Sequence, residues 1–329
     1  ENEGVNFGAF FPVNLMSNPF NFPIAQDFYK EDVLVDGHEK GYAKTLAVWD
    51  LKKLKEEVKI SVEISSPSPP SPPSPPAKQE DKKELKSNSK VENLTIVSGL
   101  WNIARAGRDF SIYEEHFDKF LKIPAPMVLF VPKSLEQFVW DRRSRENTFV
   151  RVYELDDIKE TMFKPFWEKA EAIRTNPEWL NLTGEGGWLP NSPQASNQWY
   201  NPIVMSKMFF MHDSKIWNPF DTDYFVWLDA GISQTCYENY FYDPKILEGI
   251  RDKIDPFLFL SYPYEACDEI HGFKFKEMNQ YAGKTVDYVC RGGLFGSHKE
   301  FLSQANSLYY ELLERSLSNG LMGTEESIF

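Results

Sequence analysis

Short apolar runs alternate with amphipathic stretches along the chain after residue 90. The apolar runs predict buried strands at residues 94–98, 127–131, 148–153, 224–228, 257–261 and 288–290. Apolar residues at helical spacing predict helices at 111–122 and 299–318, and Pro202 predicts the first turn of another helix. This alternation predicts an α/β fold, in which helices cover both faces of a mostly parallel central sheet.

A Pro-rich stretch divides the chain. Residues 65–76 repeat Ser-Pro-Pro, and the residues up to 90 are rich in Lys, Glu and Ser. This composition is typical of an extended, solvated linker, although a Pro tract can also bind an SH3 domain. We therefore expect an N-terminal segment (1–64), a linker (65–90) and a main domain (91–329). Within the N-terminal segment, residues 44–60 have the spacing of a short amphipathic helix.

Composition excludes several classes of protein. A net charge of −13 argues against a nucleic-acid partner, because phosphate contacts require a basic surface. No apolar run approaches the roughly 20 residues that span a bilayer. The widely spaced Cys236, Cys267 and Cys290 match neither a disulfide framework nor a zinc pattern, which favours a reducing, cytoplasmic location. The chain begins with Glu1, as expected for part of a longer polypeptide with further domains.

The run at residues 224–228 ends abruptly in Asp229. A buried strand places this carboxylate at its carboxyl end, where α/β sheets bind ligands. Gly231 lets the backbone turn tightly, so Asp229 suits a divalent cation that holds a diphosphate, or else simply caps the turn. The Asp-Thr-Asp sequence at 221–223 precedes the strand and is expected at the opposite edge.

Three basic features have both a functional and a structural interpretation. The loop after residue 98 carries Arg105 and Arg108, which suit an anion or a solvated, salt-bridged loop. A second basic run, at residues 141–145, is more typical of a charged surface. Lys207 projects from the apolar face of the helix that Pro202 opens. It therefore either reaches water or pairs with a carboxylate or phosphate.

The last candidate residues surround the predicted final helix. Gly292 and Gly293 follow a predicted strand and permit close approach of a sugar, or form a plain turn. Glu325 and Glu326 could supply a base, or form an acidic loop. His298 could complete a metal site with Asp229, or cap the helix.

Several of these pieces occur in one order along residues 93–329. They are Thr95-Ile96-Val97-Ser98, Asn102-Ile103-Ala104-Arg105, the stretch 200–207, Trp227 to Ile232, Gly292 to Gly296 and Gly323 to Ser327. Together they resemble the bacterial HtrL/YibB-like proteins, which look like GT-A glycosyltransferases. The Ser-Pro-Pro linker is also similar to linkers in multidomain glycosyltransferases of large algal viruses. This resemblance implies that the cytoplasmic location is the cytoplasm of an infected host cell.

This resemblance implies a glycosyltransferase that moves a sugar from a nucleotide-sugar donor to a glycan acceptor with Mn²⁺ or Mg²⁺. Asp229 matches the first acid of the DxD motif of GT-A enzymes, but Gly231 stands at the third position. The family's Asp-Glu pair here reads Glu325-Glu326, with Glu326 or Glu325 expected as the base of an inverting reaction. The expected metal ligands are Asp229 and His298. The expected donor-binding residues are Ser98, Arg105, Arg108, Lys207, Asp229, Ala230, Gly231, Gly292 and Gly293.

Other interpretations stay open at this point. The reaction can invert or retain configuration at the transferred sugar. The incomplete DxD motif also suits a carbohydrate-binding module without catalysis, whose Trp-rich stretch from Trp167 to Trp199 would stack on sugars. A nucleotidyltransferase would use the same diphosphate-binding edge.

Overall fold

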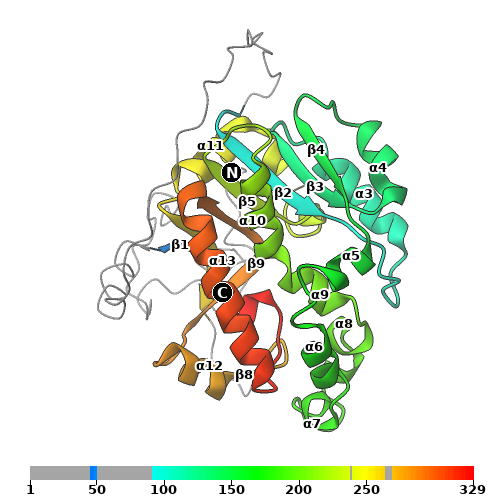
Figure 1. The fold of residues 1–329 in the computed structure, drawn as a ribbon, viewed down its shortest axis with the longest axis vertical. Helices are drawn as coiled ribbons and strands as arrows, with labels where there is room; N and C mark the ends of the chain where they lie inside the picture. The colour runs from blue at the N-terminus through cyan, green and yellow to red at the C-terminus, as the bar shows by residue number, and fades with distance from the viewer. Residues whose placement is uncertain (1–44, 50–90, 238, 264–268) are drawn as a thin grey trace, which may run out of the picture.

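The structure of the protein, a computed structural model, describes residues 45–49, 91–237, 239–263 and 269–329 (Figure 1). Apart from residues 45–49, the predicted N-terminal segment and linker lie outside the described residues. No helix in the described ranges is long and apolar enough to cross a membrane.

The centre of the described chain is a seven-stranded sheet in the order β1-β6-β9-β5-β2-β3-β4. Strands β2, β3, β4 and β5 are parallel to one another, while β9 is antiparallel to both β5 and β6. A second, two-stranded sheet pairs β7 with β8. The strands are β1 Thr45–Trp49, β2 Leu94–Gly99, β3 Met127–Val131, β4 Thr148–Val152, β5 Tyr224–Leu228, β6 Phe257–Pro263, β7 Glu269–Ile270, β8 Phe273–Lys274 and β9 Tyr288–His298.

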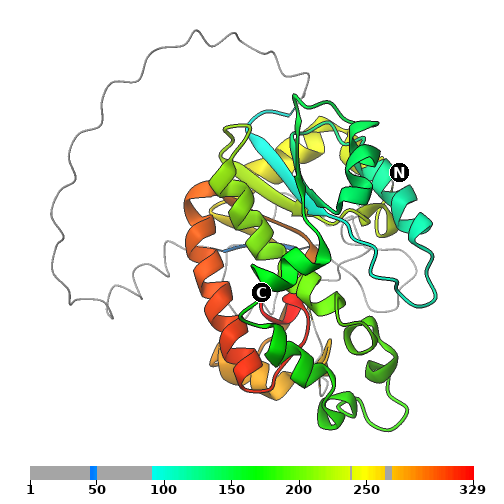
Figure 2. The same ribbon diagram turned by 45° about the vertical axis from the view of Figure 1, so that its right-hand side comes forward.

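Helices cover both faces of the large sheet (Figures 1 and 2), which confirms the predicted α/β architecture. Helices α6, α10 and α13 pack on one face, and α3, α4 and α11 pack on the other. The α-helices are α3 Phe110–Phe120, α4 Lys133–Trp140, α5 Leu155–Glu160, α6 Trp167–Arg174, α7 Pro177–Leu180, α8 Pro193–Ser196, α9 Tyr200–Met205, α10 Lys207–Trp217, α11 Pro244–Asp252, α12 Phe275–Ala282 and α13 Lys299–Ser318.

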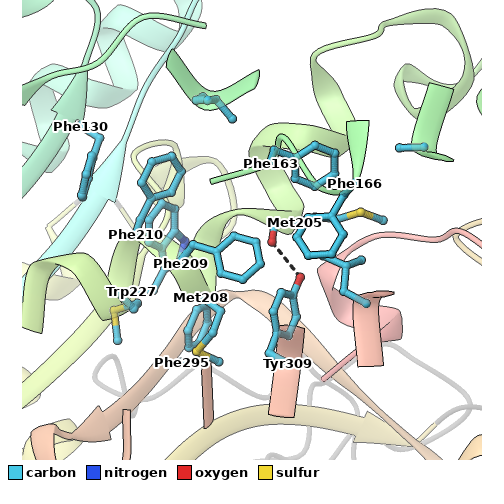
Figure 3. Close-up of a cluster of buried hydrophobic side chains, with 14 of the residues drawn as sticks. Phe130, Phe163, Phe166, Met205, Met208, Phe209, Phe210, Trp227, Phe295 and Tyr309 are labelled. Carbon is cyan, nitrogen blue, oxygen red and sulfur yellow. Dashed lines mark hydrogen bonds between the residues drawn. The ribbon is translucent and has the colours of Figure 1, made fainter. Parts of the chain in front are cut away.

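Strand β5 shows why the buried strands are apolar throughout. Its side chains alternate between the faces, so Phe225 and Trp227 pack under α10 and α13 while Val226 and Leu228 pack on the other side. Trp227 stacks on Phe210 of α10 at 6.1 Å between ring centroids, within the aromatic core drawn in Figure 3. This packing fixes α10 against the carboxyl end of β5.

The Pro202 helix is two helices rather than one. Helix α9 ends at Met205 and α10 begins at Lys207, with Ser206 between them. The Ser206 hydroxyl donates a hydrogen bond of 2.6 Å to the carbonyl of Pro202, and Tyr309 of α13 donates one of 2.9 Å to the carbonyl of Met205 (Figure 3). The break therefore places Lys207 in the first turn of α10.

Two predicted elements differ from the structure. Residues 45–49 form strand β1, paired antiparallel with β6, instead of the start of a helix, because a short apolar stretch fits either element and the edge of β6 offers backbone partners. The remainder of the predicted helix, 50–60, lies outside the described residues. The last strand runs to His298 instead of ending at residue 290, so Gly292 and Gly293 lie inside β9. Glycine is depleted in strands, so these residues resemble a turn in sequence.

Candidate active site

Asp229 lies where β5 ends, as the sequence predicts. Its backbone N–H donates to the carbonyl of Gly293 at 3.0 Å, which joins the turn after β5 to β9. Its side chain is 40% exposed, although Trp227 and Leu228 before it are buried. A strand buried on both faces thus delivers one accessible carboxylate to its carboxyl end.

Lys207 is buried beside this carboxylate. Its ammonium lies 2.9 Å from Oδ1 of Asp229 and 2.6 Å from Oε1 of Glu325, and it donates to the carbonyl of Gly292 at 3.0 Å. Burial alone would lower the pKa of Lys207, but the charges of Asp229 and Glu325 outweigh burial and raise that pKa. The lysine therefore pairs with carboxylates and does not reach water.

The two oxygens of Asp229 have different surroundings. Oδ1 receives Lys207 and also accepts a 2.7 Å hydrogen bond from the indole N–H of Trp227. Oδ2 faces Gly293, where a Cβ atom would lie at an ordinary contact distance of 3.6 Å. Within the described part of the chain, no group donates a hydrogen bond to Oδ2, so this oxygen is available to a ligand.

Glu325 begins a 3-10 helix, Glu325–Ser327, and its side chain is buried against β9. Burial raises the pKa of Glu325 to about 7 against the opposing charge of Lys207. A Cβ atom on Gly292 would lie 1.9 Å from Oε1 of Glu325. Gly292 therefore makes room for this carboxylate, which corrects the prediction that it opens space for a sugar.

Glu326 faces the other side of the same backbone. Its Oε1 accepts from the N–H of Gly292 at 2.9 Å, while Oε2 lies 2.8 Å from Nε2 of His271 and 3.4 Å from Nη1 of Arg291. Burial alone would raise the pKa of Glu326, but the hydrogen bond from His271 and the charge of Arg291 lower it. The acidic-loop interpretation of Glu325-Glu326 is thus wrong, since both carboxylates have fixed partners.

A cavity of about 140 Å³ opens at the carboxyl end of β2. Its lining combines two guanidinium groups with aromatic rings, including Trp101, Arg105, Arg108, Phe110, Tyr113 and Tyr200. The Arg105 guanidinium donates to the Tyr113 hydroxyl at 3.3 Å and lies 5.8 Å from the centroid of the Tyr200 ring. The predicted arginine loop therefore lines a pocket.

Two residues connect this cavity with Asp229. Arg108 donates at 3.2 Å to Gln234, which ends the 3-10 helix Ile232–Gln234 directly after the Asp229 turn. Tyr200 lines the cavity, and burial together with the charge of Glu325 raises the pKa of its hydroxyl to about 12. The arginines and the acidic cluster are thus parts of one region.

Comparison with known proteins shows the family of the chain. The model of a family described as bacterial proteins of unknown function, HtrL/YibB, matches residues 91–319. The chain belongs to the HtrL/YibB family. No curated protein matches it. Among solved structures, core-mannan synthase A from Aspergillus fumigatus, in its Mn/GDP form, is similar over 79% of this chain and 75% of its own, at 9% identity and a TM-score of 0.42.

Three predicted site residues of this HtrL/YibB protein make structural contacts instead of facing the cavity or the free oxygen of Asp229. Ser98 is fully buried and donates a 2.6 Å hydrogen bond to the carbonyl of Leu228, so it joins β2 to β5 instead of facing the cavity. Ala230 is buried in the core. His298 pairs with Tyr224 at the start of β5 and caps α13 by accepting from the N–H of Glu300.

His298 is therefore excluded as a second metal ligand beside Asp229. The register of β5 and β9 sets Leu228 opposite Leu294 and Tyr224 opposite His298, so the histidine and Asp229 lie at opposite ends of the same strand. The prediction of His298 as a metal ligand failed because the sequence predicts a strand that ends at residue 290. The actual strand, β9, continues to His298 and runs antiparallel to β5. The Asp-Thr-Asp sequence lies at that far end, at the edge of the sheet where it was predicted. Its Asp223 pairs there with Lys299 at 2.7 Å.

The basic run at 141–145 is exposed at four of its five residues, as predicted for a charged surface, and Arg143 is the exception. Arg143 is buried and donates to the carbonyls of Leu121, Ile123 and Ala125. Burial lowers the pKa of Arg143 to about 10. This arginine closes the loop between α3 and β3 and belongs to the scaffold of the HtrL/YibB fold, not to its surface.

Gly231 and Gly293 adjoin Asp229 without binding its carboxylate. Gly231 precedes the 3-10 helix, and a Cβ atom there would lie 2.8 Å from the Gln234 amide. The sequence alone did not reveal His271 and Arg291 as the partners of Glu326. The one local signal for His271 is Gly272 directly after it, because glycine is common in two-residue hairpin turns.

Proposed function

We propose that the protein is a glycosyltransferase that moves a sugar from a nucleotide-sugar donor to a hydroxyl group of a glycan acceptor. The observation that carries this proposal is the arrangement of Asp229: Lys207 and Trp227 fix one carboxylate oxygen, and the other oxygen remains available beside Gly293. A cavity lined by two arginines and several aromatic rings lies nearby, and its Arg108 donates to Gln234 in the 3-10 helix that follows Asp229.

The cavity suits the nucleoside diphosphate of the donor. Aromatic rings offer flat faces to a base, and the guanidinium groups of Arg105 and Arg108 match phosphate oxygens in geometry and charge. When the sugar–phosphate bond breaks, negative charge develops on the diphosphate. Arginines fixed beside it stabilise that charge without having to reorganise.

A divalent cation fits this site in one specific way. No group of three or more His, Cys, Asp or Glu side chains in the described ranges is arranged to hold a metal, and Gly231 contributes no second carboxylate. Mg²⁺ and similar cations often bind through one or two carboxylates together with substrate phosphates and water. Oδ2 of Asp229 would hold the cation, which when bound would neutralise charge on the diphosphate.

The buried Lys207–Glu325 pair has a positioning role in this proposal. Lys207 uses its three N–H groups on Asp229, Glu325 and the carbonyl of Gly292, so no N–H remains for a donor phosphate. Its charge orients Asp229 and balances the two carboxylates. The prediction that Lys207 binds the donor directly is therefore replaced by a role through Asp229.

One observation favours a second function, a carbohydrate-binding module. Trp188 in the Trp-rich stretch is 44% exposed and offers a flat face to a sugar, whereas Trp167 and Trp179 are buried. A lectin, however, does not require the Asp229 carboxylate beside an arginine-lined cavity.

A donor panel tests the proposed function. The protein is incubated with UDP- and GDP-sugars and with Mn²⁺ or Mg²⁺, and release of nucleoside diphosphate is measured with and without glycan acceptors. We expect slow donor hydrolysis that Asp229→Asn abolishes and that Asp221→Asn, at the opposite edge of the sheet, leaves intact. Absence of hydrolysis and transfer with every donor would favour the lectin, and release of pyrophosphate from nucleoside triphosphates would indicate a nucleotidyltransferase.

A further inference from the structure

The β7–β8 hairpin is fixed at the edge of the acidic cluster. His271 and Gly272 form its two-residue turn, and both have left-handed backbones with φ values of 52° and 90°. Positive φ at both positions is typical of a type I′ turn. The Trp179 indole N–H donates to the carbonyl of Gly272 at 2.8 Å, and a Cβ atom on Gly272 would lie 2.8 Å from that indole. The surroundings therefore hold this turn in one conformation.

The turn directs the His271 imidazole at Glu326, with 2.8 Å between Nε2 and Oε2. Two further groups hold the same carboxylate, the N–H of Gly292 and the guanidinium of Arg291. A carboxylate anion only accepts hydrogen bonds, so Nε2 carries the hydrogen and Nδ1 of the neutral ring has a free lone pair. No donor within the described residues occupies Nδ1. The His271 side chain is 28% exposed, compared with 13% for Glu326.

His271 and Asp229 flank the same two glycines of β9. The N–H of Gly292 holds Glu326 and thereby His271, and the carbonyl of Gly292 holds Lys207 and thereby Asp229. The next residue, Gly293, lies beside Oδ2 of Asp229. A sugar beside Gly293 would have the proposed cation site on one side and the imidazole on the other.

The exposed ring of Trp188 is joined to the same hairpin. Its indole N–H donates at 3.0 Å to Oε1 of Glu269, and Oε2 of Glu269 accepts from the N–H of Gly272 at 2.8 Å. The carboxylate of Glu269 thus fixes both the turn and the ring. An exposed tryptophan ring beside a base is the arrangement that would hold a sugar ring and deprotonate one of its hydroxyl groups.

From this arrangement we infer that the β7–β8 hairpin is the acceptor side of the site, with His271 as the catalytic base, Glu326 as its positioning residue and Trp188 as the platform for the acceptor sugar. The inference rests on the proposed glycosyltransferase function. It reassigns the base from Glu326, whose oxygens are already engaged by three donors.

The transfer step then balances as follows. The acceptor hydroxyl oxygen forms a bond to the anomeric carbon of the donor sugar while its proton passes to Nδ1 of His271. The bond from the anomeric carbon to the phosphate oxygen breaks, and its electron pair leaves on the nucleoside diphosphate. Glu326 stabilises the imidazolium that forms, which later releases its proton to water. A single displacement inverts the anomeric configuration of the transferred sugar.

Variants at position 271 test the base. Asn and Gly both tolerate a left-handed backbone, so His271→Asn and His271→Gly should fold. We expect turnover to fall by about 10²- to 10⁴-fold with unchanged donor binding, and added imidazole to restore part of the activity of His271→Gly. His298→Asn, a histidine substitution that keeps a helix-capping side chain at the far end of β5, is the matched control and should retain wild-type turnover.

A second variant and the stereochemistry of the product complete the test. Trp188→Ala should raise the KM for the acceptor by about 3- to 10-fold while donor hydrolysis persists, because stacking on the ring contributes only to acceptor binding. Wild-type turnover in both His271 variants, or retention of configuration in the product, would overturn the assignment of the base. If the wild-type protein hydrolyses no sugar nucleotide at all, the proposed function itself fails instead.

Discussion

The ammonium of Lys207 lies 2.9 Å from Oδ1 of Asp229, at the point where the first turn of α10 meets the carboxyl end of β5. The same ammonium binds Glu325, more than 100 residues later in the chain. A buried cation that satisfies two carboxylates at once determines both the fold of this edge and the orientation of the exposed oxygen of Asp229. The predictions below separate these structural and functional roles.

Removal of the Lys207 ammonium should lower the stability of the protein strongly. Lys207→Met leaves Glu325 buried without its partner, so we expect the free energy of unfolding to fall by about 3–5 kcal/mol, measured by urea denaturation. Adding Glu325→Gln should recover part of this loss, with a coupling energy of about 0.5–3 kcal/mol. The matched control is Lys299→Met, which breaks the solvent-exposed pair with Asp223 and should cost about 1 kcal/mol or less. Strict additivity of Lys207→Met and Glu325→Gln would contradict the pairing.

The two adjacent glycines of β9 should respond differently to a methyl group. Gly292→Ala places Cβ 1.9 Å from Oε1 of Glu325, so the carboxylate must leave its contact with Lys207. We expect destabilisation by about 1–3 kcal/mol or more, measured by thermal and urea unfolding. Gly293→Ala meets nothing closer than 3.6 Å and should change stability by about 0.5 kcal/mol or less. Equal effects of the two substitutions would show that Glu325 does not occupy the space beside Gly292.

The raised pKa of Glu325 predicts how stability depends on pH. In the folded protein the pKa is about 7, above its ordinary value, so between about pH 4.5 and 7 the folded state binds this proton more tightly than the unfolded state does. Stability from this group should therefore decrease as pH rises through that window. The wild-type protein should show a more negative slope of unfolding free energy against pH than Glu325→Gln. Parallel slopes would contradict the burial of an ionisable Glu325.

The arginine-lined cavity should govern donor affinity. Arg105→Ala removes a guanidinium from the cavity, and loss of a charged hydrogen bond of about 1.5–3 kcal/mol predicts donor binding roughly 10- to 100-fold weaker by calorimetry. Arg145→Ala, which removes an arginine that lies over the Trp140 ring on α4, is the control and should bind the donor normally. If both variants bind alike, the cavity is not the nucleotide site.

Local sequence patterns were sufficient to predict most of the sheet and the position of Asp229. A buried strand such as 224–228 has to be apolar on both faces, and its first polar residue marks the edge. The partnership of Lys207 with a carboxylate was also predictable, because a lysine on an apolar face needs a partner. These inferences depend on residues close together in sequence.

Contacts set by strand register were not predictable in this way. The antiparallel return of β9 brings Gly293 beside Asp229 and carries His298 to the opposite end of β5. Glycines in the middle of β9 concealed the strand. His271 was missed because its role depends on a hairpin of two-residue strands and on Glu326, which lies 55 residues further along the chain.

The most direct test of the central claim is calorimetric titration of UDP- and GDP-sugars into the protein, with and without Mn²⁺. If a cation on Asp229 holds the donor diphosphate, the wild-type protein and Asp221→Asn should bind one of these donors more tightly when Mn²⁺ is present. Asp229→Asn should lose this enhancement while its thermal unfolding stays cooperative. The same Mn²⁺-dependent affinity in Asp229→Asn as in the wild-type protein would contradict the account.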